Sequence, residues 1–404
     1  MTQVLKRGCV GKPTKSDMGG CAMEPTIAIV GVGETAPLRK STKDVRELTL
    51  EASLSAIQDA GLQCSDIDGI ITDAGIMPST VPQDWMAAQL GISPNFTACL
   101  SYGGAGIVAA PMLAQYAIES GRATAVLFYF GVDWGSRADG PYAFHDMYPA
   151  KKTFEKPYGF NAQPCYFGLW TRRYMHEYGL TEDDLAEIAI SQRANALLNG
   201  RGQMTTALDR EGYYKSRLIS DPLRAADCCL LSDGAGAYVM TSRKRAQDCR
   251  KTPVLVRGVG FGGVAVTGDD VFTQGKSLLI SPAAAKASEF AQRAAGITLE
   301  DVDFAEIYDC FTISCLMQIE DLGFCAKGEA AAFIRERGIT VGGRLPVNTH
   351  GGLLSYSYRL GIEHMVEAVR QLRGESGNAQ VANARVGLVG GFSPPDYGVT
   401  ILSR

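Results

Sequence analysis

Residues 51–70 read EASLSAIQDAGLQCSDIDGI, and residues 287–307 read ASEFAQRAAGITLEDVDFAEI. Each segment has the pattern of an amphipathic helix that ends at an Ala-Gly pair. The glycine is Gly61 in the first segment and Gly296 in the second, and glycine is a natural helix terminator. In each, an Asp follows the Gly after the same interval, and an apolar strand begins soon after it. This shared order favours an internal duplication over a chance agreement between two generic strand–helix units.

The strand patterns that precede these helices agree as well. Residues 27–33 read IAIVGVG and residues 254–260 read VLVRGVG, each a β-branched run with a pair of glycines. Alternating strand and helix patterns predict mixed sheets flanked by helices, which is the α/β class. We therefore expect an N-terminal half at 26–252 and a C-terminal half at 253–404, preceded by a polar, Gly-rich arm at 1–25.

The composition is that of an ordinary globular protein. The chain has 404 residues, 46% of them hydrophobic and 20% charged, and a net charge of −4. This charge offers no broad basic surface to nucleic acid or to anionic lipid. No apolar run reaches the roughly 20 residues that span a bilayer, and the polar first 25 residues lack the apolar core of a signal peptide.

The cysteines predict a reducing compartment. The chain contains 11 cysteines, an odd number, and most of them lie inside apolar segments. They therefore indicate buried thiols of a cytoplasmic protein rather than a disulfide framework. No Cys-x-x-Cys spacing is present, so the sequence predicts no zinc site, and no other metal site, on this chain.

Between the two repeated segments, residues from about 132 to 180 form an insertion rich in Tyr, Phe, Trp, Gly and Pro. Long aromatic loops in compact domains commonly form a lid or the wall of a binding site. The insertion could therefore wall a pocket for a bulky apolar acyl group. The alternative is a surface excursion that packs on itself.

Two stretches in the second half resemble active-site loops of the thiolase family. Residues 306–311 read EIYDCF and residues 348–358 read NTHGGLLSYSY. The resemblance runs from about residue 26 to the end of the chain, apart from the insertion, and implies the thiolase fold, a duplicated architecture of five αβαβα layers. In that family the first loop carries an Asn or a His and the second carries a His. This chain has Tyr308 and Tyr358 at those positions.

The same resemblance shows that the thiolase cysteines are missing. We expect a helix at Ile107–Ser120, and alignment with the family places the nucleophile position at Gly104, whereas Cys99 would need a shifted register to act. Leu388 stands where the family has its second cysteine, and the following Gly390 and Gly391 are expected in a tight turn whose backbone approaches the acyl group. Covalent acyl-enzyme chemistry then has neither its nucleophile nor its acid–base partner.

A glycine in place of the cysteine and two tyrosines in these loops resemble one branch of the family, the bacterial steroid side-chain aldolases. That branch implies retro-aldol cleavage of a β-hydroxyacyl-CoA, with Tyr308 and Tyr358 as base and proton donor in an order left open. Two alternatives stay open. One is a thiolase or acyltransferase that uses a shifted cysteine, and the other is a non-catalytic scaffold or lipid-binding subunit.

The neighbours of the two tyrosines are expected to support them. Asp309 either orients Tyr308 or caps a helix that begins near Phe311, and capping is favoured. Asn348 and His350 either donate to the thioester oxygen or stabilise a turn, and His350 is a rival general base. His364 is expected to be structural. The supporting residues are thus Asp309, Asn348, His350, Gly351, Gly352, Gly104, Gly390 and Gly391.

The resemblance also implies partners. These are an acyl-CoA substrate, a second copy of the chain in a homodimer, and a small OB-fold protein with a zinc ribbon that completes a heterotetramer. It implies no cofactor on this chain, and zinc only in the partner. Four basic residues of the insertion are candidates for phosphate contacts, although solvated surface charge is the favoured interpretation of each: Lys151, Lys152, Arg172 and Arg173.

Overall fold

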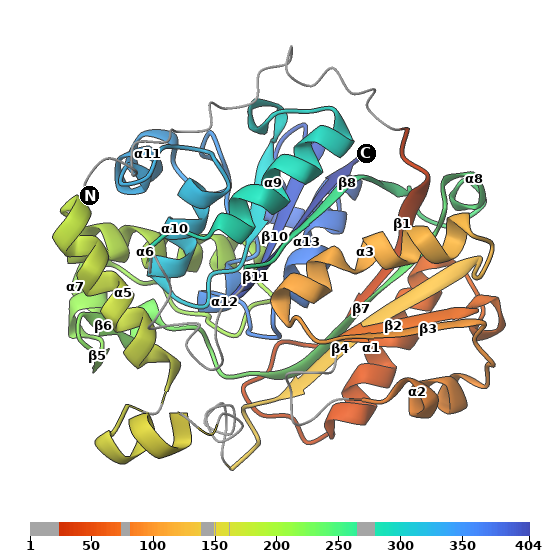
Figure 1. Cartoon of the computed structure of the whole chain (residues 1–404), viewed down its shortest axis with the longest axis horizontal. Coiled ribbons are helices and arrows are strands. Elements are labelled where there is room, and N and C mark those ends of the chain that lie inside the picture. Colours follow the sequence, from red (N-terminus) through yellow and green to blue (C-terminus); the bar gives the residue numbers. More distant parts are fainter. Residues whose placement is uncertain (1–23, 74–80, 139–148, 150, 161, 265–278) are drawn as a thin grey trace, which may run out of the picture.

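A computed structural model of the chain describes residues 24–73, 81–138, 149, 151–160, 162–264 and 279–404. Most of the predicted arm at 1–25 and part of the aromatic insertion therefore lie outside the described residues. Nine strands of the described chain form one mixed sheet in the order β3-β2-β4-β7-β1-β8-β11-β10-β9 (Figure 1). The strands are β1 (Ile27–Glu34), β2 (Gly69–Asp73), β3 (Phe96–Leu100), β4 (Ala125–Asp133), β7 (Asp233–Ser242), β8 (Val254–Gly262), β9 (Phe304–Ile307), β10 (Val386–Ser393) and β11 (Asp396–Ser403).

The two halves of this sheet repeat one topology. In the first half, β2 runs parallel to β3 and β4, and β7 runs antiparallel to β4 and β1. In the second half, β9 runs parallel to β10 and forms a parallel bridge from Ala305 to Val347, while β11 runs antiparallel to β10 and β8. The halves join where Ala28 and Ile29 of β1 pair with β8. The predicted duplication is confirmed.

Helices cover the sheet in layers. The helices are α1 (Val45–Ala60), α2 (Gln83–Leu90), α3 (Gly104–Glu119), α5 (Gln163–Tyr178), α6 (Glu182–Asn199), α7 (Arg210–Lys215), α8 (Arg243–Ala246), α9 (Pro282–Ala295), α10 (Thr312–Asp321), α11 (Ala330–Arg337), α12 (Gly352–Ser355) and α13 (Ile362–Arg373). A two-stranded sheet of β5 (Leu218–Ser220) and β6 (Leu223–Arg224) lies beside α5. Helix α1 packs on the first half of the large sheet and α9 on the second.

Helices α3 and α13 lie between the two halves of the sheet. The Tyr238 hydroxyl of β7 donates to the carbonyl of Ile107 in α3 over 2.7 Å, and the Thr400 hydroxyl of β11 donates to that of Val108 over 2.6 Å. One helix is thus bonded to strands of both halves, which gives the five layers of the predicted fold.

Glycines on the opening strands explain how closely the outer helices approach. A Cβ at Gly33 of β1 would lie 2.2 Å from the Ala52 carbonyl of α1, and one at Gly260 of β8 would lie 1.9 Å from the Ala287 carbonyl of α9. The helices could not pack at this distance against any larger residue. Both outer helices end as predicted, because the glycine that follows each of them has a left-handed backbone.

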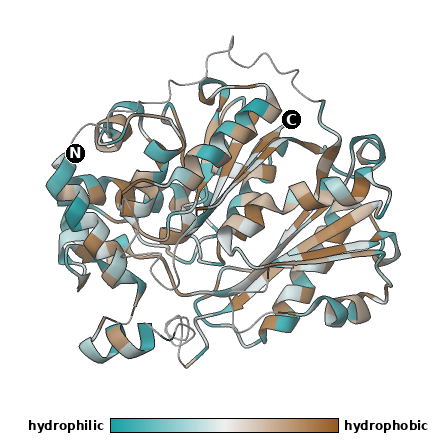
Figure 2. Ribbon diagram, in the orientation of Figure 1, coloured by the Kyte–Doolittle hydropathy of each residue, from teal (hydrophilic) through white to brown (hydrophobic). Residues whose placement is uncertain are grey.

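Figure 2 shows hydrophobic residues along the strands and hydrophilic residues on the outward sides of the surrounding helices. Strand β4 is buried along almost its whole length, as expected for a strand covered on both faces. Among the helices that the structure describes, none combines the length and the apolar composition needed to cross a bilayer. The cysteines in the described ranges are all free thiols.

Candidate active site

The two predicted tyrosines meet at the centre of the second half. Tyr308 follows directly after β9, and Tyr358 lies in the loop that follows α12. Their hydroxyl oxygens are 2.7 Å apart, a hydrogen bond in which either phenol could be the donor. The rings stand nearly perpendicular, with an interplanar angle of 79°. Tyr308 is buried and Tyr358 is partly exposed, so the pair reaches the surface on the side of Tyr358.

Gly104 lies against this pair. It is the first residue of α3, so this helix begins three residues earlier than the predicted Ile107. The helix can start there because the amide of Ile107 already donates to the carbonyl of Gly103. A Cβ at Gly104 would lie 2.7 Å from Cε2 of the Tyr308 ring. The ring of Tyr308 therefore fills the space into which any side chain at position 104 would project.

Aromatic residues from other elements enclose the tyrosines. The ring of Trp134, which follows β4, lies 4.4 Å from that of Tyr358. The ring of Phe392 in β10 lies 6.2 Å from that of Tyr308, in an edge-to-face arrangement. Helix α5 of the insertion adds Phe167, which stacks on Phe311 at 4.3 Å. The described part of the insertion thus packs against the site instead of only on itself.

Burial sets the protonation of the pair. It raises the pKa of both phenols well above their usual value, and the neighbouring phenol raises that of Tyr308 further. Both side chains are therefore neutral hydroxyls around neutral pH.

Two residues that the sequence did not point to hold the tyrosine backbones. The amide of Tyr358 donates to the hydroxyl of Ser232 over 2.9 Å, across 126 positions of sequence. The side-chain amide of Gln318 in α10 donates to the carbonyl of Tyr308. The position of Gln318, ten residues after Tyr308 on the next helix, is a signal that could have identified it. Ser232 carries no such signal, because only the fold brings it to the loop.

The expected role of Asp309 as a cap of the helix near Phe311 is wrong. That helix, α10, begins with the Phe311 amide donating to Ser314 over 3.0 Å. Asp309 instead accepts from the amide of Leu353 over 2.7 Å, at the start of α12. The carboxylate follows a strand whose next neighbour in space is the glycine loop, so it caps the helix that the loop begins. Burial raises the pKa of Asp309 to about 6.

The glycine loop itself is packed closely. Gly351 and Gly352 both have left-handed backbones, with φ of 104° and 62°. A Cβ at Gly351 would meet Ala196 of α6 at 2.4 Å, and one at Gly352 would meet the Asp309 carboxylate at 2.0 Å. Only glycine fits at either position, so both residues shape the loop that carries Tyr358.

Asn348 and His350 face away from the tyrosine hydroxyls. The side-chain oxygen of Asn348 accepts from the amide of Ile307 over 2.7 Å, which ties the glycine loop to the end of β9. His350 is buried, and its Nδ1 lies 3.0 Å from the carboxylate of Glu306. Burial alone would raise the pKa of Glu306, but His350 and His364 hold it at about 2. His364, expected to be structural, thus belongs with His350 to one buried charged cluster.

The expected tight turn at Gly390 and Gly391 is also wrong. Both residues lie inside β10, which pairs with β11 without interruption. A Cβ at Gly391 would lie 2.0 Å from the carbonyl of Gly104, and one at Gly390 would lie 2.6 Å from the Tyr397 hydroxyl. Glycine is needed at position 391 because the strand packs closely on α3, and at position 390 because it packs against the buried Tyr397. Leu388 is a buried residue of the same strand.

The remaining candidates lie elsewhere. Cys99 is exposed on β3, at the opposite edge of the sheet order from β9. The Tyr356 hydroxyl donates to Glu34 over 2.7 Å and is not part of the tyrosine pair. Of the four basic residues of the insertion, Lys152 is exposed and three are in ion pairs, Lys151 with Glu155, Arg172 with Asp221 and Arg173 with Glu177.

The fold and the site together define a class of protein. Two α/β repeats enclose a central helix, and the helix begins at the residue where thiolases keep their nucleophile. Here that residue is a glycine covered by a tyrosine, and a second tyrosine is hydrogen-bonded to the first. The class is a thiolase-fold enzyme without the thiolase cysteine.

Comparison with known proteins narrows this class. Residues 263–400 match the family model "Thiolase C-terminal domain-like". A steroid side-chain-cleaving aldolase from Thermomonospora curvata is 33% identical, over 93% of this chain and 97% of its own length. A 17-hydroxy-3-oxo-4-pregnene-20-carboxyl-CoA lyase from Mycobacterium tuberculosis is 34% identical, over 93% of this chain and 98% of its own.

A solved structure of an aldolase is also similar to this chain. The Ltp2-ChsH2(DUF35) aldolase superposes with a TM-score of 0.86 at 32% identity, covering 95% of this chain and 98% of that one. The chain belongs to the thiolase superfamily and, within it, to the side-chain-cleaving aldolases, which are carbon–carbon lyases.

Proposed function

We propose that the chain cleaves a β-hydroxyacyl-CoA with a steroid acyl group by a retro-aldol reaction, giving a ketone or aldehyde and a short acyl-CoA. The hydrogen bond between the hydroxyls of Tyr308 and Tyr358, beside Gly104, carries this proposal. The names of two relatives support the substrate class, since one is a steroid side-chain-cleaving aldolase and the other acts on a pregnene carboxyl-CoA.

The reaction transfers one proton, from the β-hydroxyl to the α-carbon, and requires no oxidant. The β-hydroxyl loses its proton as the Cα–Cβ bond breaks, and the electron pair of that bond passes into the thioester carbonyl to form an enolate. The enolate α-carbon then takes up a proton. The proton lost by the oxygen equals the proton gained by the carbon, so two hydroxyls in direct contact suffice as base and acid.

Contact between the phenols avoids a free phenolate. A buried phenolate without a positive partner would be costly, and Tyr308 is buried. When the hydroxyls are 2.7 Å apart, the first phenol can take the substrate proton as it passes its own proton to the second, and the second gives its proton to the α-carbon, so that both phenols end neutral. The proposal therefore assigns both roles to the pair, and either phenol can be the one that faces the substrate hydroxyl.

The aromatic surroundings suit a polycyclic acyl group. Trp134 and Phe392 place apolar rings beside the tyrosines, and Phe167 adds a ring that stacks on the nearby Phe311. Helix α5 adds Trp170, whose ring lies 6.4 Å from that of Phe392. A flat, apolar ring system gains most from such a wall, since aromatic side chains bury large apolar areas at low entropic cost.

The test is cleavage of a β-hydroxy steroid acyl-CoA, followed by mass spectrometry of both products. Tyr308→Phe and Tyr358→Phe are compared with Tyr214→Phe, an exposed tyrosine of α7. We expect products without added free CoA in the parent and in the control, and their loss in both site variants. Products that require free CoA would mean thiolysis, and unchanged cleavage in both site variants would refute the role of the pair.

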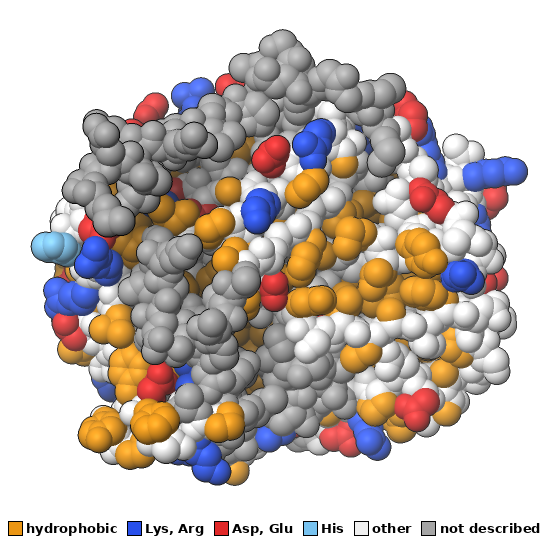
Figure 3. All heavy atoms as spheres, in the orientation of Figure 1, with side chains coloured by type: hydrophobic (Ala, Val, Ile, Leu, Met, Phe, Trp, Pro, Cys, Tyr) orange, Lys and Arg blue, Asp and Glu red, His pale blue; other side chains and the backbone are white. Residues whose placement is uncertain are grey.

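We further propose that the chain forms a homodimer through β3. This strand is the edge of the sheet, and its residues Thr97 and Cys99 are exposed. Unpaired edge strands readily pair with a second copy. Figure 3 shows apolar side chains gathered over the neighbouring helix α3, where Met112 and Tyr116 are exposed; Tyr102, just before this helix, is exposed as well. Sedimentation velocity is expected to give a dimer in the parent and a monomer in Tyr116→Arg.

A small second subunit is proposed on the evidence of the related structure, whose name includes a DUF35 component. We expect this partner to be an OB-fold protein with a zinc ribbon that holds the acyl-CoA and completes a heterotetramer. Co-purification of the two co-expressed chains tests it, and separate elution of both would refute it. We also propose that the protein is cytoplasmic.

A further inference from the structure

A second group of reactive side chains lies behind the tyrosine pair. Glu306 lies in β9, His350 precedes the two glycines of the glycine loop, and His364 lies on α13. One ligand atom from each lies within 4.8 Å of the others, and all three side chains are buried. Two of the chain's four histidines are thus gathered around one carboxylate.

The polar atoms of this group are not satisfied by hydrogen bonds. Among the residues that the structure describes, none forms a hydrogen bond with either ring nitrogen of His350 or of His364, or with Oε2 of Glu306. Oε1 of Glu306, by contrast, accepts from the Thr349 hydroxyl over 2.6 Å. Nδ1 of His350 and Oε2 of Glu306 face each other at 3.0 Å as an ion pair, whereas the nearest carboxylate oxygens to His364 are 3.7 and 3.8 Å away. Buried polar groups nearly always have a close partner, so the nitrogens of His364 and Nε2 of His350 indicate a missing component.

The spacing fits ligands that share an ion. Glu306 Oε2 lies 3.0 Å from Nδ1 of His350 and 3.8 Å from Nδ1 of His364. Two ligands at about 2.0–2.2 Å from a tetrahedral ion are about 3.4 Å apart, which is the middle of this range. All three ligand atoms lie within 4.8 Å of one another, so the side chains must rotate to bring the widest pair closer before they can share an ion. Two imidazoles and one carboxylate are a ligand set for a divalent transition metal such as zinc.

The surroundings of His364 support the same conclusion. Its Nδ1 faces Glu306, and its Nε2 lies 3.7 Å from Oδ1 of Asp309. A histidine that binds a metal through one nitrogen commonly presents the other to a carboxylate, which orients the ring. Asp309 is itself fixed by the amide of Leu353.

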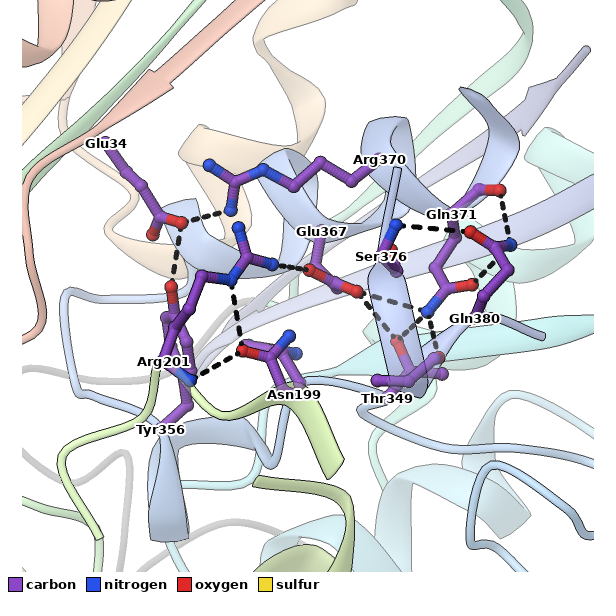
Figure 4. Close-up of polar contacts among 12 residues, drawn as sticks. Glu34, Asn199, Arg201, Thr349, Tyr356, Glu367, Arg370, Gln371, Ser376 and Gln380 are labelled. Carbon is purple, nitrogen blue, oxygen red and sulfur yellow. Dashed lines mark hydrogen bonds and ion pairs between the residues drawn. The ribbon is translucent and has the colours of Figure 1, made fainter. Parts of the chain in front are cut away.

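Nearby cations are engaged with other carboxylates. Arg359 pairs with Glu34. Figure 4 shows Arg370 beside Glu34 as well, and Arg201 beside Glu367 at 3.4 Å. Arg359 also lies 3.9 Å from Glu363, another buried carboxylate of α13. These carboxylates are thus balanced by arginines, whereas the carboxylate of Glu306 faces the two histidines, where a divalent cation would balance its charge.

We propose that Glu306, His350 and His364 bind one divalent transition-metal ion of the zinc class, with Asp309 orienting His364 from the far side. The ligands come from three separate elements, so this site has no short spacing that a sequence would reveal. It is distinct from the tyrosine pair and does not depend on the proposed reaction.

The test is the metal content of the full chain, expressed alone so that no partner contributes zinc, and purified with a peptide tag that lacks histidine. Inductively coupled plasma mass spectrometry is applied to the parent, to Glu306→Gln and His364→Ala, and to the control His176→Ala, an exposed histidine of α5. We expect stoichiometric metal in the parent and the control, and metal lower by about tenfold or more in the two ligand variants.

A second measurement does not depend on the folding of the variants. The parent is stripped with a chelator, and Co²⁺ is added while the visible absorption of the ion is recorded. A saturable tetrahedral Co²⁺ spectrum, together with a higher melting temperature on addition of Zn²⁺, supports the site. A folded, stripped parent that shows neither effect, and a purified parent without metal, would overturn the proposal and leave two protonated imidazoles as the balancing charge.

Discussion

Substitution of Gly104 by alanine should break the hydrogen bond between Tyr308 and Tyr358. The new Cβ would lie 2.7 Å from Cε2 of Tyr308 and 2.9 Å from the carbonyl oxygen of Phe392. Carbon atoms in contact are about 3.5–4.0 Å apart, so the ring must retreat by about 0.8 Å or more. The Phe392 carbonyl belongs to β10, which is paired with β11 and cannot yield easily. The displacement therefore falls on the ring of Tyr308.

The hydrogen bond does not tolerate this shift. The hydroxyls of Tyr308 and Tyr358 are 2.7 Å apart, and bonds between hydroxyls extend to about 3.0 Å, which leaves about 0.3 Å of slack. A misplacement of this size in a catalytic group lowers kcat by about a hundredfold. Overpacking of the interior costs about 1–3 kcal/mol of unfolding free energy. Alanine itself suits the first turn of a helix, so both losses would arise from the contact.

The assay measures kcat for cleavage of the steroid thioester and the unfolding free energy in urea, for Gly104→Ala and for Gly342→Ala. Gly342 is the matched control, because it is exposed and a Cβ there would meet no atom within 4 Å. We expect the control to equal the parent in both measurements. A folded Gly104→Ala variant with an unchanged kcat would show that the contact between helix α3 and the tyrosine does not matter for the reaction.

Three further substitutions test the surroundings of the pair. Trp134→Leu removes the ring that packs on Tyr358 and should lower kcat by about tenfold, and the melting temperature should fall as well because Trp134 is buried. Ser232→Ala leaves the buried amide of Tyr358 without its acceptor and should lower the unfolding free energy in urea by about 1–3 kcal/mol. Burial raises the pKa of Asp73 from 3.8 to about 6, so the folded state binds this proton more tightly than the unfolded state. The stability of the parent relative to Asp73→Asn should therefore be greatest below pH 4 and fall by about 3 kcal/mol at most as the pH rises through 6, which melting curves across pH can measure.

Local signals made the fold predictable. Helix ends at Gly61 and Gly296, and glycines spaced by two on the opening strands, are properties of single segments that survive in any context. Their repetition at the same spacing gave the duplication. The contact between Tyr308 and Tyr358 could also be predicted, since both residues follow elements at the same end of the second repeat.

The errors have a common physical origin. Two helices, α10 and α12, begin near Asp309. Its carboxylate accepts from the start of α12, which only the fold brings close, and not from α10, which follows it in sequence. Gly391 belongs to a glycine pair typical of a turn, but a glycine is needed there because the carbonyl of Gly104 on a distant helix lies close to it. In each case the residue type correctly predicted a close contact. The segment on the other side of that contact is distant in sequence, so the sequence did not identify it.

The packing of the site makes the loss of the nucleophile and the gain of the tyrosines a single change. A cysteine at position 104 would project into the ring of Tyr308, so the two residues cannot both occupy the site in this arrangement. Restoring the cysteine alone should therefore displace the tyrosine instead of recovering thiolysis. Restoring the loop residue alone would leave a space beside Gly104 and no nucleophile. The two chemistries exclude each other sterically at one point, where the start of α3 meets the end of β9, and a chain of this fold must commit to one of them.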